Sequence, residues 1–276
     1  MPTPAHLLHH FATPLTRRLA LLLALAASNP LYAQEPPAGT VQRIQTRDNV
    51  SVPIYTLWRD GAIATVVLFS GGGGGYGQIG EDGWPGSSNF LIRTGKRWAS
   101  HPFNIVMIGR PSDAIDLSLG AIRIGEKHTA DTMAILREIK TRHPQPIWLV
   151  GTSMGTISAT SASIQDQENL VAGLVLSASI VAYKTPGSLF QQSLEKILVP
   201  TLVVHHELDA CSACRPDEAG KLASALSHAP IRKTLMLRGG SGASGNPCGP
   251  LHHHGFIGME NETVDLIAAW IIKPTE

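Results

Sequence analysis

A serine between two glycines stands where an apolar run of the sequence meets a helical pattern. Residues 151–155 read Gly-Thr-Ser-Met-Gly; the apolar run 147–150 precedes them and the small-residue segment 154–167 follows. This pattern at a strand-to-helix junction is typical of a tight turn that holds a serine hydroxyl clear of a sheet. A helix N-terminus also favours negative charge beside that hydroxyl. We predict Ser153 as the nucleophile of an acyl-transfer reaction; the alternative is a structural serine in a glycine-rich turn.

In folds that carry the nucleophile on such a strand-to-helix turn, the partners follow in the order Ser, acid, His, so we look for a carboxylate after the serine. Asp209 lies in a loop after the apolar run 201–205. A carboxylate there would hold the tautomer of an imidazole and stabilise the imidazolium. Glu207 stands too close to the end of the run, and we expect Asp217 to cap a helix. We therefore predict Asp209 as the acid.

Three consecutive histidines, residues 252–254, precede the last helical pattern of the chain. Only one imidazole of the run can face Ser153. We predict His254, because Gly255 permits a tight turn behind it and Phe256 can anchor the loop in apolar surroundings. His252 and His253 remain the alternatives, and they are otherwise expected in a solvated loop.

A serine and five glycines, residues 70–75, follow the apolar run 65–69. Acyl transfer needs backbone N–H donors for the developing oxyanion. We predict one donor at Met154 and the other at Gly72, with Gly73 as the next choice. A phosphate-binding loop would end in Gly-Lys-Ser/Thr, which this loop lacks. A merely flexible loop is the remaining alternative.

All three cysteines lie in the C-terminal third, at positions 211, 214 and 248. An odd count predicts one disulfide and one free thiol. A Cys211–Cys248 disulfide would tie the loop of the acid to the loop of the histidine, but Cys214 is an alternative partner for either. The cysteines, Asp209 and the nearby histidines also have the side-chain types of a zinc site. Because no metalloprotease pattern accompanies them, we predict no metal ligands and no cofactor.

The elements that would position these residues alternate along the chain. Eight strands are expected at 41–47, 50–58, 65–69, 104–108, 147–150, 171–176, 201–205 and 233–237. Helical patterns occupy 90–99, 121–142, 154–167, 217–226 and 260–272. Short apolar strands alternating with helices predict an α/β protein whose sheet is mostly parallel and covered on both faces. The first two strands form an antiparallel hairpin at one edge.

The N-terminal segment has the order of a secretory signal: Arg17 and Arg18, the apolar run 19–27, then Leu-Tyr-Ala at 31–33. We predict a signal peptide over residues 1–33, a single domain over 34–276, and a periplasmic or extracellular location without membrane attachment after cleavage. An uncleaved anchor is the alternative. The formal net charge of +1 and the lack of a basic run argue against a nucleic-acid partner. The expected partner is a small-molecule substrate, and the sequence leaves the oligomeric state open.

The chain resembles the α/β-hydrolase superfamily over nearly its whole mature length. More narrowly, it resembles secreted proteobacterial serine hydrolases of unassigned substrate. The segments that carry the resemblance are 70–75, 89–93, 111–113, 151–155, 209–211, 247–248 and 254–256. The resemblance implies acyl transfer by a Ser–acid–His mechanism without a cofactor. Two features differ from the pattern of these proteins. Gly109 and Arg110 stand before Pro111, where such proteins often carry an acid, and Cys214 is an additional cysteine.

Little chain is available for a lid, because only residues 180–199 lie between the sixth strand, 171–176, and the strand 201–205 that precedes Asp209. We therefore expect an open or shallowly covered site for small or exposed acyl groups. The loop 76–88 is expected either to form a further wall through Trp84 or to be a disordered surface loop. The predicted activity is hydrolysis of carboxylic esters. A peptidase, amidase or acyltransferase with the same triad, or a non-catalytic periplasmic binding protein that kept the fold, are the alternatives.

Overall fold

One eight-stranded sheet forms the centre of the molecule. The structure, a computed structural model, describes residues 1–2, 36–114 and 116–276. Within them the strand order is β1-β2-β6-β3-β7-β8-β9-β10. The strands are β1 (Thr40–Arg47), β2 (Val50–Leu57), β3 (Ala64–Phe69), β6 (Phe103–Ile108), β7 (Ile147–Thr152), β8 (Val171–Ser177), β9 (Thr201–His206) and β10 (Arg232–Leu237). Strand β2 runs antiparallel to β1 and β6, and every other pair is parallel. The predicted mostly parallel sheet is confirmed.

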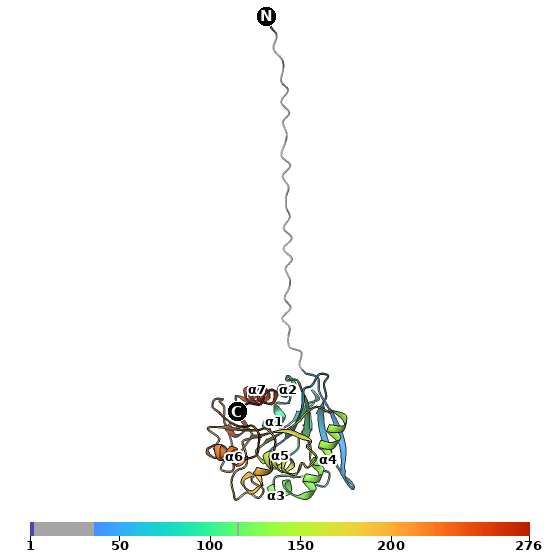
Figure 1. Cartoon of the computed structure of the whole chain (residues 1–276), viewed down its shortest axis with the longest axis vertical. Coiled ribbons are helices and arrows are strands. Elements are labelled where there is room, and N and C mark those ends of the chain that lie inside the picture. Colours follow the sequence, from blue (N-terminus) through green and yellow to red (C-terminus); the bar gives the residue numbers. More distant parts are fainter. Residues whose placement is uncertain (3–35, 115) are drawn as a thin grey trace. The chain divides into compact units, whose positions relative to one another are not determined.

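Helices cover both faces of the sheet. They are α1 (Phe90–Arg93), α2 (Gly95–Ala99), α3 (Gly120–Arg123), α4 (Glu126–Arg142), α5 (Met154–Gln165), α6 (Ala219–Ala225) and α7 (Glu260–Ile272). Figure 1 shows α1, α2 and α7 on one side and α4, α5 and α6 on the other. Each group buries its own apolar cluster against the sheet. The central strands are therefore apolar on both faces, which explains why they appear in the sequence as continuous apolar runs.

Three helical patterns are interrupted. Thr94 ends α1, and its hydroxyl donates a hydrogen bond to the Phe90 carbonyl at 2.7 Å. Gly125, in extended conformation, separates α3 from α4. The pattern 217–226 begins with the 3₁₀ turn η3 (Pro216–Glu218), so α6 starts later and Asp217 is not its cap. Gly95, Gly125 and Pro216 stand at these three breaks, and glycine and proline are poor residues for a helix interior.

The segments that border the carboxyl edge of the sheet are short. Between β8 and β9 the chain forms only two 3₁₀ turns, η1 (Leu189–Gln191) and η2 (Leu194–Lys196), so the lid is minimal. The loop after β3 contains a small hairpin of β4 (Gln78–Ile79) and β5 (Pro85–Gly86). Trp84 packs in the core, with its ring centroid 5.7 Å from that of Tyr55. The expectation that Trp84 forms a wall of the site is therefore wrong.

The predicted signal peptide falls almost wholly on residues 3–35, which lie outside the described residues. The extent of the signal peptide and the single domain from residue 34 therefore stay predictions. Among the helices that the structure describes, none has the length and apolar character needed to cross a membrane.

Candidate active site

Ser153 occupies the sharp turn between β7 and α5. Its backbone adopts φ 52° and ψ −128°, a conformation that costs energy for a residue with a side chain. Its N–H donates to the Ser177 carbonyl at 3.0 Å on the neighbouring strand β8. A β-carbon at Gly155 would lie only 1.9 Å from the Phe69 carbonyl oxygen, so α5 can approach the sheet only with glycine there. The turn therefore presents Ser153 at the carboxyl edge of the sheet.

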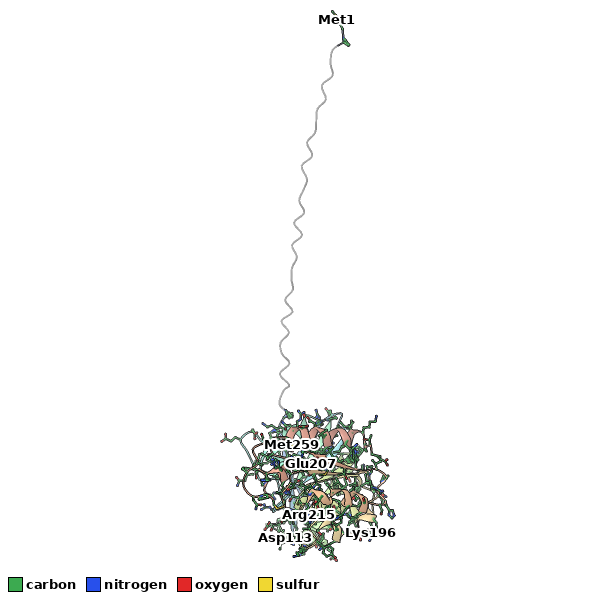
Figure 2. All side chains as sticks on the ribbon, turned by 90° about the vertical axis from the view of Figure 1, so that its left-hand side faces the viewer. Met1, Asp113, Lys196, Glu207, Arg215 and Met259 are labelled. Carbon is green, nitrogen blue, oxygen red and sulfur yellow. A yellow bond between two sulfur atoms is a disulfide. The ribbon has the colours of Figure 1, made fainter. Side chains whose placement is uncertain are left out.

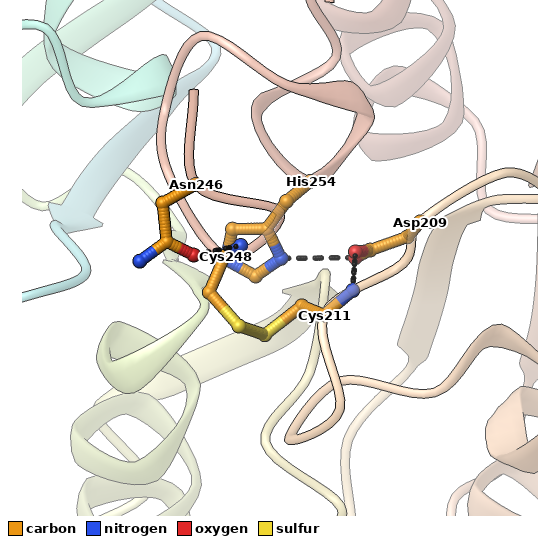
Figure 3. Close-up of a disulfide and its surroundings, with 5 residues drawn as sticks. All are labelled: Asp209, Cys211, Asn246, Cys248 and His254. Atoms are coloured by element: carbon orange, nitrogen blue, oxygen red, sulfur yellow. Dashed lines mark hydrogen bonds and ion pairs between the residues drawn. A yellow bond between two sulfur atoms is a disulfide. The ribbon is translucent and has the colours of Figure 1, made fainter. Parts of the chain in front are cut away.

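His254 and Asp209 meet at this edge, although 45 residues separate them. His254 Nδ1 lies 2.9 Å from Asp209 Oδ2, and the side chains are 5% and 0% exposed. Asp209 also accepts a hydrogen bond from the Cys211 N–H at 2.9 Å (Figure 3). With its carboxylate held on both sides, Asp209 fixes the proton of the His254 ring on Nδ1. The opposite nitrogen, Nε2, is buried and has no hydrogen-bond partner among the described residues.

The other two histidines of the run contact each other and a strand residue instead. They lie at the start of the 3₁₀ turn η4 (His253–Gly255). The ring of His253 stacks on His206, with centroids 4.5 Å apart, and the ring of His252 packs edge-on against His253. Burial, followed by electrostatic effects of His206 and His252, lowers the pKa of His253. Of the three, His254 is therefore the residue that reaches Asp209.

The competing acids lie elsewhere. Glu207, labelled in Figure 2, pairs with Arg238 at 2.9 Å, and its side chain is 40% exposed. Asp217 is exposed and pairs with Arg215. Each of these carboxylates thus forms a salt bridge with an arginine at the surface, and neither contacts His254.

Hydrogen bonds hold all five carbonyl groups of the glycine loop. Two of these carbonyls accept from backbone groups: the Gly74 N–H donates to Gly71, and the Leu117 N–H donates to Gly73. The other three accept from side chains: Arg123 donates to Gly72, Arg110 to Gly74 and the Ser70 hydroxyl to Gly75. All five distances lie between 2.7 and 3.1 Å. In contrast, the structure gives no protein acceptor to the N–H of Gly72 or of Met154 within the described residues. Gly72 has a positive φ of 55°, which a residue with a side chain rarely adopts. The loop therefore fixes its carbonyls and leaves N–H groups for an anion.

Arg123 connects this loop to α5. Its side chain is almost fully buried and donates to the carbonyls of Leu117 at 2.7 Å and Gly72 at 2.9 Å, and to the Ser158 hydroxyl at 3.0 Å. Burial lowers the pKa of Arg123 to about 10, which keeps the guanidinium charged at neutral pH. His128 completes the group, with Nε2 2.9 Å from the Ser158 hydroxyl.

Arg93 supports the opposite side of the site. Its guanidinium donates to the Gly255 carbonyl at 2.7 Å and to Glu260 at 3.1 Å. It also donates to the Ser88 carbonyl. The ring of Phe256 packs 4.8 Å from that of Phe90, so the loop of His254 is anchored by both polar and apolar contacts.

Ser153 and His254 line one cavity of about 280 Å³. Its other walls come from the glycine loop, from residues 87–90 and 250, and from Arg110, Thr152, Cys248 and Gly255. The wall that the loop 76–88 contributes consists of Ser87 and Ser88. The volume is at the lower end for small-molecule sites, which favours small groups next to Ser153. In the described chain His254 Nδ1 contacts Asp209 and Nε2 has no partner, so no hydrogen bond joins His254 to Ser153. Such contacts often tighten only when substrate binds.

Cys211 and Cys248 form a disulfide across 37 positions, and Cys214 is a buried thiol. Figure 3 shows the bridge beside His254, between the loops that carry the acid and the histidine. One donor atom each of Cys211, Cys214 and His254 lies within 4.8 Å of the other two. The Cys211 sulfur is bonded to Cys248 and cannot be a thiolate, so this group retains only two of the ligands that zinc requires.

Burial changes the acidity of two groups close to Asp209, namely Cys214 and His205. Burial and the charge of Asp209 raise the pKa of the Cys214 thiol well above its usual value, against a smaller opposing effect of the Ser153 hydroxyl. Burial also lowers the pKa of His205 to about 4, despite the opposite effect of Asp209. His205 is therefore neutral at physiological pH, and its Nε2 accepts the Ser179 N–H at 3.2 Å.

Two supporting residues escape sequence reasoning. Arg93 stands in the helical pattern 90–99 and in a segment that carries the family resemblance, and Arg123 is one of several cations in the helical pattern 121–142. A charged residue on a helix is usually solvent-exposed. Folding brings the carbonyls of Gly72 and Leu117 and the Ser158 hydroxyl together around position 123, and these acceptors make a buried guanidinium favourable there.

Part of the sequence matches a known family model. Residues 119–235 match the model described as serine aminopeptidase, S33. This stretch includes Ser153 and Asp209 and ends before His254. No curated protein matches the chain.

Solved structures share the fold over most of the chain. An α/β serine hydrolase homologue from Coxiella burnetii superposes with a TM-score of 0.59 at 19% identity, covering 84% of this chain and 97% of its own. An esterase from Pyrococcus furiosus gives 0.60 at 14% identity, covering 85% and 92%. An α/β serine hydrolase without a lid from Xanthomonas campestris gives 0.56 at 12% identity, covering 87% and 98%. With the sheet order and the turn at Ser153, these similarities show that the chain has the α/β-hydrolase fold.

Proposed function

We propose that the protein is an exported serine hydrolase that cleaves carboxylic esters of small or exposed acyl groups with Ser153, Asp209 and His254. The observation that carries the proposal is the buried pair of His254 and Asp209 at 2.9 Å, whose imidazole lines the same cavity as Ser153. His254 Nε2 has no hydrogen-bond partner in the described chain, so it is available to a hydroxyl proton.

In the first half-reaction, Ser153 Oγ bonds to the ester carbonyl carbon while its proton moves to His254 Nε2. The carbonyl oxygen becomes an oxyanion and accepts hydrogen bonds from the N–H groups of Gly72 and Met154. Asp209 stabilises the imidazolium. As the carbon–oxygen bond to the leaving group breaks, His254 returns the proton to the departing alcohol, and an acyl-enzyme on Ser153 remains.

In the second half-reaction, water takes the place of the alcohol. His254 Nε2 removes a proton from the water as its oxygen bonds to the acyl carbon, and the same N–H groups bind the oxyanion. Collapse of this intermediate breaks the bond to Ser153 Oγ, which recovers its proton from His254. The carboxylic acid leaves, and the enzyme returns to its starting state.

A covalent probe and a chromogenic ester test the proposal together. We expect a fluorophosphonate to label wild-type protein once, on Ser153, and p-nitrophenyl acetate to be hydrolysed. The Ser153→Ala variant should lose the label and several orders of magnitude in rate. The matched control is Ser179→Ala, which removes a buried hydroxyl in the loop after β8. Unlabelled wild type would favour a binding protein that kept the fold.

A peptidase or amidase is the second candidate, because the matching family model is described as a serine aminopeptidase. The same groups would then protonate an amine leaving group. Paired acyl p-nitrophenyl esters and p-nitroanilides with the same acyl group separate the two activities. If the protein is an esterase, kcat/KM for the ester should exceed kcat/KM for the anilide by much more than the difference in leaving-group reactivity explains. Similar kcat/KM values for the ester and the anilide would support the peptidase.

The proposed location is the periplasm or the extracellular space. The signal-like order of residues 1–33 supports it, and so does the Cys211–Cys248 disulfide, since disulfides persist in oxidising compartments. The intact mass of protein recovered from a periplasmic extract tests this: it should correspond to a chain that begins at Gln34 and contains one disulfide. Full-length, fully reduced protein found only in the cytoplasmic fraction would contradict it.

A further inference from the structure

The cavity at Ser153 carries a positive charge that the hydrolytic mechanism does not use. Arg110 lines the cavity, and among the described lining residues it is the one side chain with a permanent charge. No aspartate or glutamate of the described chain belongs to that lining, and the remaining polar side chains there are neutral or the titratable His254. A substrate in this space therefore meets the Arg110 guanidinium.

Arg110 lies close to the reacting serine through the glycine loop. A β-carbon at Gly71 would be 2.9 Å from Ser153 Cβ, and one at Gly73 would be 3.3 Å from Arg110 Nη2. Two Cα–Cα steps span at most about 7.6 Å, so Gly71 and Gly73 are near neighbours. Arg110 Nε donates to the Gly74 carbonyl at 3.0 Å, which ties the guanidinium to the loop. Because Ser153 and Arg110 line the same cavity of about 280 Å³ on this short loop, a substrate bound there can contact both residues.

Asp116 lies beside Gly73, as the Arg110 guanidinium does, and partly offsets the charge of Arg110. A β-carbon at Gly73 would lie 2.6 Å from Asp116 Oδ1, so the carboxylate and the guanidinium meet over the same glycine. Asp116 accepts hydrogen bonds from the Ser118 N–H at 2.9 Å and hydroxyl at 2.7 Å. These bonds, followed by the charge of Arg110, lower the pKa of Asp116. Asp116 is therefore ionised and offsets part of the Arg110 charge without lining the cavity.

We propose that Arg110 makes the enzyme selective for esters that carry a carboxylate beside the scissile bond. The inference rests on the ester hydrolysis proposed above and names its substrate class. A guanidinium suits this role because its planar fork can bind both oxygens of a carboxylate. If Arg110 served only to hold Gly74, its loss would affect charged and neutral esters equally.

Two pairs of esters that differ mainly in charge test the proposal. p-Nitrophenyl hemisuccinate and its methyl ester place the charge on the acyl side, whereas 4-acetoxybenzoate and 4-acetoxybenzamide place it on the leaving group. For each enzyme the measured quantity is the ratio of kcat/KM for the anionic ester to that for the neutral one. Damage to the glycine loop changes both members of a pair and cancels in this ratio.

We expect Arg110→Gln to lower the ratio about tenfold in at least one pair, the effect of one charge-assisted hydrogen bond. Arg110→Lys should keep part of the ratio because it keeps the charge. Asp116→Asn, which leaves the arginine in place, should raise it. The pair that responds identifies the side of the ester that Arg110 recognises.

Ratios that are the same in wild type, Arg110→Gln and Asp116→Asn for both pairs would overturn the inference while leaving ester hydrolysis intact. If Arg110→Gln does not fold, Asp116→Asn decides alone, since an unchanged ratio in that variant contradicts the proposal. Failure of the wild type to hydrolyse any of the four esters would instead refute the proposed function, and this inference with it.

Discussion

Arg123 Nη2 donates a hydrogen bond to the Gly72 carbonyl at 2.9 Å, across 51 positions of the chain. The bond holds the carbonyl of Gly72 and so restrains the backbone conformation of this residue. The N–H of Gly72 is the group proposed to bind the oxyanion. Because the guanidinium is also bound to Ser158 on α5, it connects the glycine loop to the helix that begins beside Ser153. Arg123 is a positioning residue in this arrangement and does not touch the substrate.

Replacing Arg123 should impair catalysis more than substrate binding. We expect Arg123→Met to lower kcat roughly 10–100-fold with little change in KM, because a misplaced oxyanion donor costs transition-state stabilisation. The affinity for a boronic acid, which mimics the tetrahedral intermediate, should fall in parallel. Ser158→Ala is the control, since it removes one partner of Arg123 and leaves Gly72 bound. Equal losses of kcat in both variants would show that Gly72 is not the point of action.

Removing the disulfide should reduce both stability and rate. The bridge closes a loop of 37 residues, so Cys248→Ala should cost about 3–4 kcal/mol in the free energy of unfolding. The rate should fall as well, because Cys211 holds Asp209 through its N–H. Denaturant unfolding with and without reductant measures the effect. Cys214→Ala, which keeps the bridge, should respond to reductant as the wild type does; a reductant-insensitive wild type would contradict the prediction.

Among the carboxylates near the end of β9, only Asp209 should be essential for turnover. Asp209→Asn should lower kcat by roughly four orders of magnitude, because an amide in its place no longer stabilises the imidazolium or holds the required tautomer. Glu207→Gln is the matched control; it removes a carboxylate two residues away that pairs with Arg238, and kcat should stay near that of the wild type. The reverse order of effects would reassign the acid.

Acid should destabilise the fold through buried histidines. Burial lowers the pKa of His128 to about 4 from its usual 6.5. Between these values the unfolded chain binds a proton that the folded chain does not, so stability is lost as the pH falls from 6.5 towards 4. The contribution of His128 is roughly 2–3 kcal/mol.

Urea unfolding at pH 7 and pH 4.5 measures this contribution. His128→Gln should narrow the stability difference between the two pH values, because glutamine does not titrate. His228→Gln, at an exposed histidine, should leave the difference as in the wild type. An unchanged difference in His128→Gln would show that His128 does not resist protonation in the folded state.

The strands were predictable because their evidence is local. A strand buried on both faces must be apolar along its length, and the runs at 65–69, 104–108 and 147–150 show this directly. The turn at Ser153 was equally visible, since a close strand–helix approach excludes any β-carbon at Gly155. The helix breaks at Thr94 and Gly125 were less visible, because helical spacing continues across them.

The order of residues along the chain determined the fold class, the turn that carries Ser153 and the candidates for its partners. Only the tertiary structure decided which of three consecutive histidines reaches Asp209, which two cysteines pair, and that Arg123 is buried against Gly72. Each of these depends on the path of loops far apart in the sequence. The spacing of residues within one element carries no information about what a distant loop brings against it.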